Sequence, residues 1–502
     1  MAAPRQKEMN ERATVVATTT FDVVAMRSAG SGITGSIIAP NLRHHGCRMI
    51  LPPPVAQILS RLHAGGHKAY LVGGCVRDHL LGRPPKDFDV ATDAQPTELT
   101  ALFPGAELIG AHFGVILWHG VEIATFRSDG PYLDGRHPQS VHFETDPARD
   151  AARRDFTING LFYNPQTNQI IDHVNGRQDL ANKTIRAIGD ANRRFAEDHL
   201  RLLRAVRFAA RFEFEIEPAT AHAIRAHSPQ IQTVSPERIR DEISRILTEP
   251  HPRRGLELLD ELNLLEQILP EVKALQGVRQ PPNFHPEGDV WTHTLMMMEG
   301  LDKPTITQAW GVLLHDIGKP PTFTETDRIR FNGHESVGAR MATEILHRLK
   351  YPNEVIETVH ELVAQHMKFL AVKTMRASTR KRFLRHPIMP ELLELHRLDA
   401  VSSNGHLEAY NRCREELAIT PPEALTPKRL LTGDDLINMG IPKGPQIGQI
   451  LKELEDAQLE GRITTEQEAR ALVAAKHLTQ ASDPPTRKTG PPTPLPRQDI
   501  SE

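Results

Sequence analysis

The chain has 502 residues, of which 25% are charged and 39% hydrophobic, and its formal net charge is −3. This length exceeds one ordinary domain, and the balanced charge excludes a globally basic protein, so a nucleic-acid partner would have to meet a local positive surface. The three cysteines lie far apart and no apolar run reaches membrane-spanning length, so we expect a soluble, cytoplasmic protein with no disulfide framework, thiolate metal site or membrane partner.

Residues 1–49 differ from the rest of the chain. They mix Ser, Thr, Gly and scattered charges without helical or strand periodicity. Asp22 and Arg27 interrupt the apolar patches, which argues against a secretory signal peptide. We therefore expect a disordered extension, with Met49 as the start of the functional protein, and the sequence leaves open whether residues 1–48 remain in the mature protein.

A glycine turn between a strand and a helix is the first chemical signal. Ala69 to Val72 is an apolar run typical of a buried strand, and Val76 to Leu81 has a helical pattern. Gly73 and Gly74 between them allow a tight turn with free N–H groups at a helix N-terminus, where phosphate can bind. Arg77 lies one turn inside that helix, where its guanidinium could reach phosphate oxygens.

A pair of acids follows this turn. Asp87 and Asp89 alternate in an extended segment, so both carboxylates should lie on one face. Such hard oxygen ligands suit Mg²⁺ shared with substrate phosphates. Together, the turn, the arginine and the acids predict nucleotidyl transfer.

This combination resembles the signature of the bacterial-type CCA-adding tRNA nucleotidyltransferases and the related bacterial poly(A) polymerases. The resemblance covers roughly residues 50–475 and implies an α+β fold. Its expected parts are a mixed-sheet nucleotidyltransferase head (50–180), a helical neck (181–275), an HD-type helical body (276–410), a helical tail (411–476) and a disordered end (477–502).

Three further features belong to the expected head. Glu122 lies on a predicted strand, Val121 to Phe126, and could approach the Asp pair as a third carboxylate. The polar segment 132–138 predicts a loop, which in the resembling family helps to switch the site from cytosine to adenine and so favours full CCA addition. Arg153 to Leu161 resembles a second family signature, and Arg154 would bind the triphosphate.

The neck carries a predicted helix from Phe195 to Phe208 with a charged stripe. By resemblance, Asp198 and Arg201 read the base, while Arg204 and Arg207 bind the nucleotide or hold this template. Cytosine and adenine both offer an amino donor and a ring-nitrogen acceptor, which a carboxylate and an arginine can pair. Guanine and uracil would leave the same groups unpaired, and that penalty gives discrimination.

Histidines and acids recur on helical patterns in the body. Their order resembles the HD metal-dependent phosphohydrolase domain, and imidazole with carboxylate suits Mn²⁺, Fe²⁺, Ni²⁺ or Zn²⁺. Two such metals could activate a water and clamp a phosphoester. The expected ligands are His293, His315, Asp316, His334, His366 and Asp399.

In the tail, Gly444 and Pro445 precede an amphipathic helix, Ile447 to Leu459. A glycine turn before a helix could hold an RNA phosphate on its N–H groups. The tail also resembles that of bacterial CCA-adding enzymes, which contacts tRNA away from its 3′ end.

The resemblance implies addition of C, C and A to tRNA 3′ ends from CTP and ATP, with two Mg²⁺ ions on Asp87 and Asp89 and the triphosphate on Gly73, Gly74, Arg77 and Arg154. A poly(A) polymerase or an A-adding enzyme would share every motif. An HD phosphohydrolase with a vestigial head, or a non-catalytic tRNA-binding module, would also be compatible with this sequence. The HD metal, its substrate and the oligomeric state stay open at the level of the sequence.

Overall fold

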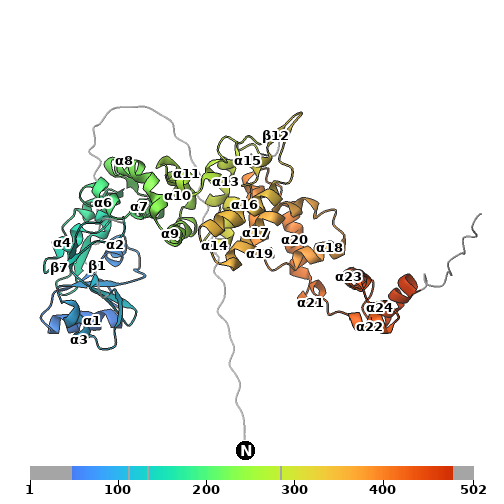
Figure 1. The fold of residues 1–502 in the computed structure, drawn as a ribbon, viewed down its shortest axis with the longest axis horizontal. Coiled ribbons are helices and arrows are strands. Elements are labelled where there is room, and N and C mark those ends of the chain that lie inside the picture. Colours follow the sequence, from blue (N-terminus) through green and yellow to red (C-terminus); the bar gives the residue numbers. More distant parts are fainter. Residues whose placement is uncertain (1–47, 111–112, 133–134, 283–284, 479–502) are drawn as a thin grey trace, which may run out of the picture. The chain divides into compact units, whose positions relative to one another are not determined.

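The computed structural model describes residues 48–110, 113–132, 135–282 and 285–478 (Figure 1). The predicted extensions at both ends therefore lie almost wholly outside the described residues. Met49 is buried in the core of the head, where its backbone N–H donates to the Tyr163 hydroxyl at 3.3 Å. The folded part thus includes Met49.

Within the described residues, seven strands form one mixed sheet in the order β3-β4-β5-β2-β1-β8-β9. β2 and β5 pair in parallel and the other neighbours are antiparallel. The strands are β1 (Ala69–Val72), β2 (Asp89–Thr92), β3 (Glu107–Gly110), β4 (Val115–Trp118), β5 (Val121–Thr125), β8 (Leu161–Asn164) and β9 (Gln169–Asp172). This confirms the predicted mixed-sheet head.

Alternation along the strands gives the sheet two buried faces. Leu71 packs into the main core, whereas its neighbour Val72 packs with Phe126 and Phe162 in a smaller cluster on the other face. The other head elements are α1 (Pro53–Ala64), α2 (Gly74–Leu80), α3 (Pro96–Leu102), β6 (Arg127–Asp129), β7 (Val141–Phe143), α4 (Pro147–Ala152) and α5 (Gly176–Ala181). Strand pairing, rather than helix packing alone, thus fixes the positions of the site residues on β2 and β5.

The neck is helical, but the predicted helix from Phe195 to Phe208 is wrong, because the structure breaks it into α6 and α7. Asp198 between them is extended, with φ −148° and ψ 105°, and its side chain accepts from the Leu200 N–H at 3.1 Å. Such local side-chain bonds stabilise non-helical backbone. The neck elements are α6 (Ala191–Glu197), α7 (Arg201–Phe212), β10 (Thr184–Ile185), β11 (Glu215–Ile216), α8 (Pro218–His227), α9 (Pro236–Thr248), α10 (Pro252–Glu261), α11 (Leu265–Ile268) and α12 (Pro270–Lys273).

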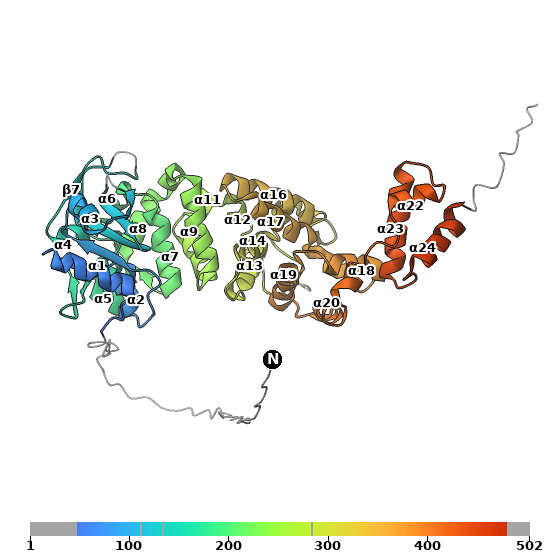
Figure 2. The ribbon, with the colours of Figure 1, turned by 90° about the horizontal axis from the view of Figure 1, so that it is seen from below.

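The body is built mainly of helices, with α16 and α17 packed side by side (Figures 1 and 2). Its elements are α13 (Val290–Glu299), α14 (Ile306–Leu314), α15 (Lys319–Thr322), β12 (Thr324–Glu325), β13 (Ile329–Arg330), α16 (His334–Arg348), α17 (Asn353–Gln365), α18 (Ala377–Leu384) and α19 (Met389–Ser402). In the described part of the chain, no helix combines the length and the apolar character needed to cross a bilayer.

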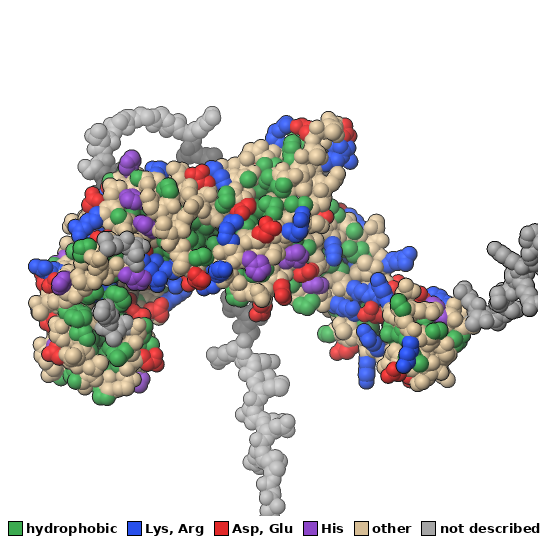
Figure 3. All heavy atoms as spheres, in the orientation of Figure 1, with side chains coloured by type: hydrophobic (Ala, Val, Ile, Leu, Met, Phe, Trp, Pro, Cys, Tyr) green, Lys and Arg blue, Asp and Glu red, His purple; other side chains and the backbone are tan. Residues whose placement is uncertain are grey.

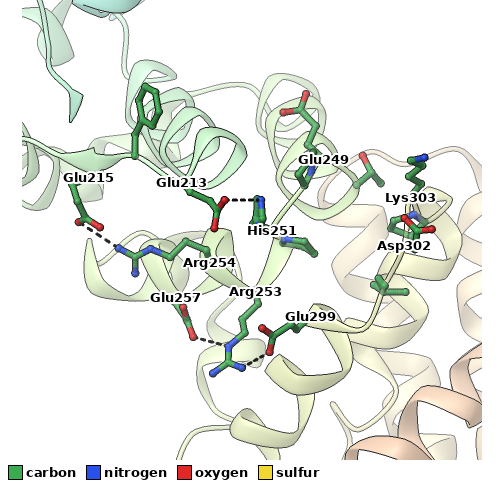
Figure 4. Close-up of a pocket in the computed structure, with 16 residues that line it drawn as sticks. Glu213, Glu215, Glu249, His251, Arg253, Arg254, Glu257, Glu299, Asp302 and Lys303 are labelled. Atoms are coloured by element: carbon green, nitrogen blue, oxygen red, sulfur yellow. Dashed lines mark hydrogen bonds and ion pairs between the residues drawn. The ribbon is translucent and has the colours of Figure 1, made fainter. Parts of the chain in front are cut away.

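Charged side chains join the neck to the body at a cleft of about 940 Å³ (Figure 4). Arg253 on α10 pairs with Glu257 on the same helix at 2.9 Å and with Glu299 on α13 at 2.5 Å. Because these pairs are partly exposed, each contributes at most about 1 kcal/mol. The cleft therefore lies at a joint between helices, where Arg253 is already paired with two acids.

The tail contains a second hydrophobic core built by α22, α23 and α24. Lys and Arg side chains gather where α18 meets this part (Figure 3). Arg382 on α18 pairs there with Glu455 at 2.8 Å and Asp456 at 2.5 Å, so acids on α23 offset part of the positive charge. The tail helices are α20 (Glu408–Ile419), α21 (Pro422–Leu425), α22 (Gly433–Asn438), α23 (Pro445–Leu459) and α24 (Glu466–Val473).

Candidate active site and a buried histidine cluster

The glycine turn between β1 and α2 faces both an arginine and a carboxylate. Gly73 has φ 71°, a conformation that favours glycine. A Cβ on Gly73 would lie 3.2 Å from Arg154 Nη1 and 3.8 Å from Asp89 Oδ2. The structure therefore places side by side three residues that lie up to 81 positions apart in the sequence (154 − 73 = 81).

Acidic side chains converge at the start of β2. Asp89 is the first residue of β2 and lies directly opposite Glu122 on β5 in the parallel register. Burial, together with the charges of Glu122 and Asp87, raises the pKa of Asp89 to about 6, against the opposing effect of Arg154. Asp87 itself precedes the strand and is exposed. Neighbouring carboxylates of this kind can together hold a divalent cation.

Arg154 is held in place by a carboxylate that the sequence motifs did not identify. Asp150 on α4 is buried and accepts from Arg154 Nη2 at 3.0 Å and from Arg153 Nε at 2.8 Å. Burial opposes its charge, but the two arginines hold the pKa of Asp150 below its usual range. The sequence signal that could have identified this contact is the spacing, since Asp150 precedes Arg153 and Arg154 by three and four residues on a helix.

Arg77, predicted to bind phosphate, is a buried link between head and neck. Its Nε donates to Asp78 at 2.8 Å and its Nη1 donates to Asn159 at 2.6 Å. The guanidinium carbon also lies 5.2 and 4.8 Å from the ring centres of Phe208 and Phe212 on α7. These contacts hold the guanidinium beside the glycine turn, so its role toward phosphate stays a prediction.

The two predicted base-reading residues line one polar cavity of about 280 Å³. Arg238 on α9 pairs with Asp198 at 3.0 Å, and Glu197 pairs with Arg201 at 2.8 Å. Neither pairing was predicted: Glu197 and Arg201 stand at the i,i+4 spacing of a helix, whereas Arg238 reaches Asp198 from 40 residues away. The cavity is lined by Phe113, Arg127, Asp129, Tyr132, Arg136, His137, Pro138, Arg153, Asp198, Arg201 and Arg238.

The next two arginines of α7 bind neighbouring elements. Arg204 donates through Nε and Nη2 to one oxygen of Asp155, at 2.8 and 2.6 Å. Arg207 Nε donates to Glu242 on α9 at 2.7 Å. Of the two predicted roles, these contacts favour holding the template rather than binding the nucleotide.

We expect Asp155→Asn to destabilise the protein by about 3 kcal/mol, because it leaves the Arg204 guanidinium half-buried without its counter-charge. Burial opposes the charge of Asp155, but Arg204 and Asn159 hold its pKa well below the usual range. A lowered pKa stabilises the fold above about pH 4, and this contribution is lost as the pH falls further.

Urea unfolding at pH 7 and pH 3 measures both effects. Asp190→Asn is the matched control, since Asp190 caps α6 by accepting from the Arg193 N–H and asparagine caps equally well. Equal unfolding free energies for Asp155→Asn and the unaltered protein at pH 7 would contradict this account.

The six predicted HD ligands converge in the body. Four histidines and Asp316 are buried, and Asp399 is half-buried. Asp316 Oδ2 lies 3.1 Å from His315 Nε2, while its Oδ1 lies 3.5 and 3.9 Å from the Nε2 atoms of His334 and His366. His293 Nε2 lies 3.2 Å from Asp399 Oδ1. Asp316 is therefore shared by two groups of ligand atoms.

Backbone carbonyls orient three of these rings. The Nδ1 atoms of His315, His334 and His366 lie 2.9, 2.8 and 2.6 Å from carbonyl oxygens, so each Nδ1 carries the proton. Each Nε2 then presents a lone pair to the cluster. His334 Nε2 and His366 Nε2 are only 3.2 Å apart, and His315 Nε2 has no hydrogen-bond partner among the described residues.

The cluster opens into a cavity of about 720 Å³. Lys319 lies on its wall and donates to Asp316 Oδ2 at 2.6 Å and to Gln280 Oε1 at 2.6 Å. Burial opposes the charge of Asp316, but His315 and Lys319 hold its pKa well below the usual range. Arg328 and Arg330 also line this cavity, which is therefore suited to an anionic ligand.

The sequence matches three protein families along its length. These are described as the poly A polymerase head domain, over residues 69–186; the probable RNA and SrmB-binding site of polymerase A, over 213–276; and the putative tRNA nucleotidyltransferase domain 2, over 336–474. The head match spans the glycine turn, the acids and Arg154.

Curated relatives and a solved structure agree with these matches. An A-adding tRNA nucleotidyltransferase of Deinococcus radiodurans is 33% identical over 427 residues, covering 81% of this chain and 94% of the relative. A CCA-adding enzyme of Streptococcus mutans is 30% identical over 420 residues, covering 82% and 94%. The crystal structure of the Bacillus stearothermophilus CCA-adding enzyme in complex with CTP matches with a TM-score of 0.65 at 25% identity, covering 86% of this chain and 99% of that one.

The two relatives are about equally similar to this chain, yet one is named an A-adding and the other a CCA-adding enzyme. The match covers 94% of the length of each. Taken with the turn, acids and arginines described above, these matches show that the chain belongs to the family of tRNA nucleotidyltransferases that includes the CCA-adding and A-adding enzymes.

Proposed function

We propose that this chain adds C, C and A to tRNA 3′ ends, from CTP and ATP, in the cytoplasm. The observation that carries the proposal is the convergence of Asp89, Arg154 and the Gly73 turn within one nucleotide phosphate's reach. Bound divalent cations, generally Mg²⁺ in nucleotidyltransferases of this kind, would lower the pKa of the RNA 3′-hydroxyl and neutralise charge on the triphosphate.

The residues of the head supply positioning and charge. Asp89, with Asp87 and Glu122 beside it, would hold the cation. Arg154, oriented by Asp150, would pair with phosphate oxygens, and the Gly73 turn leaves room for the phosphate because no Cβ stands there. No covalent intermediate is required, so rate depends on alignment of the 3′-hydroxyl with the leaving pyrophosphate.

The neck cavity would select the base. Asp198 can accept from the amino group of cytosine or adenine, and Arg201 can donate to the ring nitrogen. Tyr132 and Arg136 line the same cavity from the loop that was predicted to take part in the change from cytosine to adenine. A loop that borders the template supports complete CCA addition over a reaction that stops earlier.

The tail would contact the tRNA body. Gly444 stands at the N-cap of α23, while Arg382 of α18 meets α23 near the other end of that helix, at Glu455 and Asp456. Backbone N–H groups at a helix N-terminus and, separately, basic side chains both suit phosphates of the RNA backbone.

Product sequencing tests the proposal. A tRNA ending before CCA and a tRNA ending in CC are each incubated with CTP, ATP or both. We expect C-C from CTP on the first, a single A from ATP on the second, and CCA when both are supplied. Extension of only the CC-ending tRNA would indicate an A-adding enzyme, and a long A tract would indicate a poly(A) polymerase.

In the same assay, Asp198→Ala should raise incorporation of U or G roughly tenfold, because the unpaired-group penalty against these two bases is lost.

We further propose that the body is an HD-type metal-dependent phosphohydrolase. The observation that supports this second function is the pair of buried nitrogens His334 Nε2 and His366 Nε2, which lie 3.2 Å apart. Their lone pairs repel unless a cation or a proton lies between them. Imidazole and carboxylate ligands suit Mn²⁺, Fe²⁺, Ni²⁺ or Zn²⁺, which when bound would supply an activated water. His315, His334, His366, His293, Asp316 and Asp399 would hold the metal.

The remaining residues of this cavity bind the anion. Lys319 would stay bound to Asp316 and Gln280 and offer its remaining N–H to a phosphoryl oxygen. Arg328 and Arg330 also line this cavity, and Asp327, 2.6 Å from Arg330 Nη1, offsets part of their positive charge. The cavity is therefore suited to a phosphoester.

A further inference from the structure

We infer that Glu287 is a positioning residue of the body's metal centre, acting through His293; the inference rests on the metal centre proposed above. Glu287 lies in the turn before α13, and its side chain is 5% exposed. Neither the HD ligand pattern nor the head motifs include it. It is held between two histidines, of which only His293 belongs to the six predicted ligands.

One oxygen of Glu287 serves both histidines. Glu287 Oε1 accepts from His285 Nδ1 at 2.9 Å and lies 2.7 Å from His293 Nδ1. The ring centres of His285 and His293 are 5.0 Å apart, so the carboxylate lies at the point where the two rings meet. The three residues also form one of the compact groups of ligand atoms found among the described residues.

Both ring nitrogens of His293 face carboxylates: Nδ1 lies 2.7 Å from Glu287 Oε1 and Nε2 lies 3.2 Å from Asp399 Oδ1. A cation can be held only through a lone pair, and Nε2, which faces the predicted ligand Asp399, is the nitrogen that would supply it. In the metal-binding tautomer the hydrogen is therefore on Nδ1, where Glu287 accepts it. Carbonyl oxygens do this for the other three histidines, and Glu287 takes the equivalent place at His293.

A carboxylate does more here than a carbonyl oxygen. Its negative charge raises the basicity of the imidazole that it contacts, and loss of such a partner typically weakens metal binding about tenfold to a hundredfold. Because His293 is fully buried on α13, no water replaces the lost acceptor from outside. The side chain of Glu287 thus controls how strongly His293 binds the cation.

The test is calorimetric titration of the metal-free full-length protein with Mn²⁺. We expect Glu287→Ala to bind Mn²⁺ about tenfold to a hundredfold more weakly, and Glu287→Gln, which keeps an acceptor but no charge, to fall between. The absorption bands of the Co²⁺-loaded protein should shift in both variants. Glu335→Gln is the matched control, since that acid lies 3.7 Å from His334 Nδ1, which already donates to the Phe331 carbonyl.

The outcomes separate this inference from the metal centre itself. His315→Ala should abolish Mn²⁺ binding; if it does while both Glu287 variants bind normally, the positioning role is overturned and the centre stands. If the unaltered protein binds no Mn²⁺, Ni²⁺, Fe²⁺ or Zn²⁺, the centre fails and the inference with it. A lowered melting temperature of the metal-free Glu287→Gln protein with unchanged affinity and unchanged Co²⁺ bands would also overturn it, as a purely structural role predicts.

Discussion

Replacement of Asp89 by alanine is expected to reduce nucleotide addition to tRNA by about 10³-fold, since a lost metal ligand removes several kcal/mol of transition-state stabilisation. The fold should persist, because the substitution relieves the burial and the repulsion from Glu122 that raise the pKa of this carboxyl to about 6. The substitution should therefore act on kcat rather than on the amount of folded enzyme.

Single-turnover extension of a tRNA lacking CCA, at saturating CTP and Mg²⁺, measures the effect. Asp93→Asn is the matched control: Asp93 follows the other end of β2, and its Oδ1 accepts from the Lys68 N–H at 2.8 Å, which asparagine can preserve. Normal addition by the Asp89→Ala protein would show that Asp89 does not hold the cation on which addition depends.

Replacement of Asp316 by asparagine is expected to remove the metal of the body and to lower phosphodiester hydrolysis by about 10³-fold. Asp316 faces three histidine Nε2 atoms within 3.9 Å, and both of its oxygens are used. Lys319 also loses its counter-charge, so part of the effect is weaker anion binding.

Hydrolysis of bis-p-nitrophenyl phosphate with added Mn²⁺ or Ni²⁺ follows the second activity, and tRNA extension is measured in parallel. Asp316→Asn should leave extension within about twofold, because the head and its cation site are separate from this cluster. Asp89→Ala should give the reverse pattern. If neither variant changes hydrolysis, the phosphohydrolase proposal is wrong; if Asp316→Asn stops extension as well, the two sites do not act independently.

The head could be predicted from the sequence because its signals are local. The predicted strand and helix both form, with Gly73 between them and Gly74 as the first residue of the helix, and Asp89 begins the next strand. Glu122 was expected to be able to approach the Asp pair, and the parallel register of β2 and β5 places it directly opposite Asp89. Asp172, at the end of β9, accepts from the backbone N–H groups of Val174, Gly176 and Arg177 and so fixes the turn that follows.

The template could not be predicted in the same way, because tertiary contacts decide it. The sequence from Phe195 to Phe208 has a helical pattern throughout, yet the Asp198 side chain stabilises a break that no periodicity shows. Arg238 reaches Asp198 from 40 residues away, and Arg77 pairs with Asn159 across 82 residues. Partners this far apart in the sequence produce no local pattern. The sequence could therefore identify candidate arginines but not the residues with which they pair.

The burial of Arg77 has a consequence for how substrate size is limited. Since one side chain joins the turn at the start of α2 to the aromatic rings of α7, the proposed phosphate site and the proposed base site are tied together by buried contacts. A monomer must then fit a span set by the protein, whichever base it carries. A smaller pyrimidine and a larger purine can share that span only if side chains at the base end, rather than the backbone, adjust to the difference.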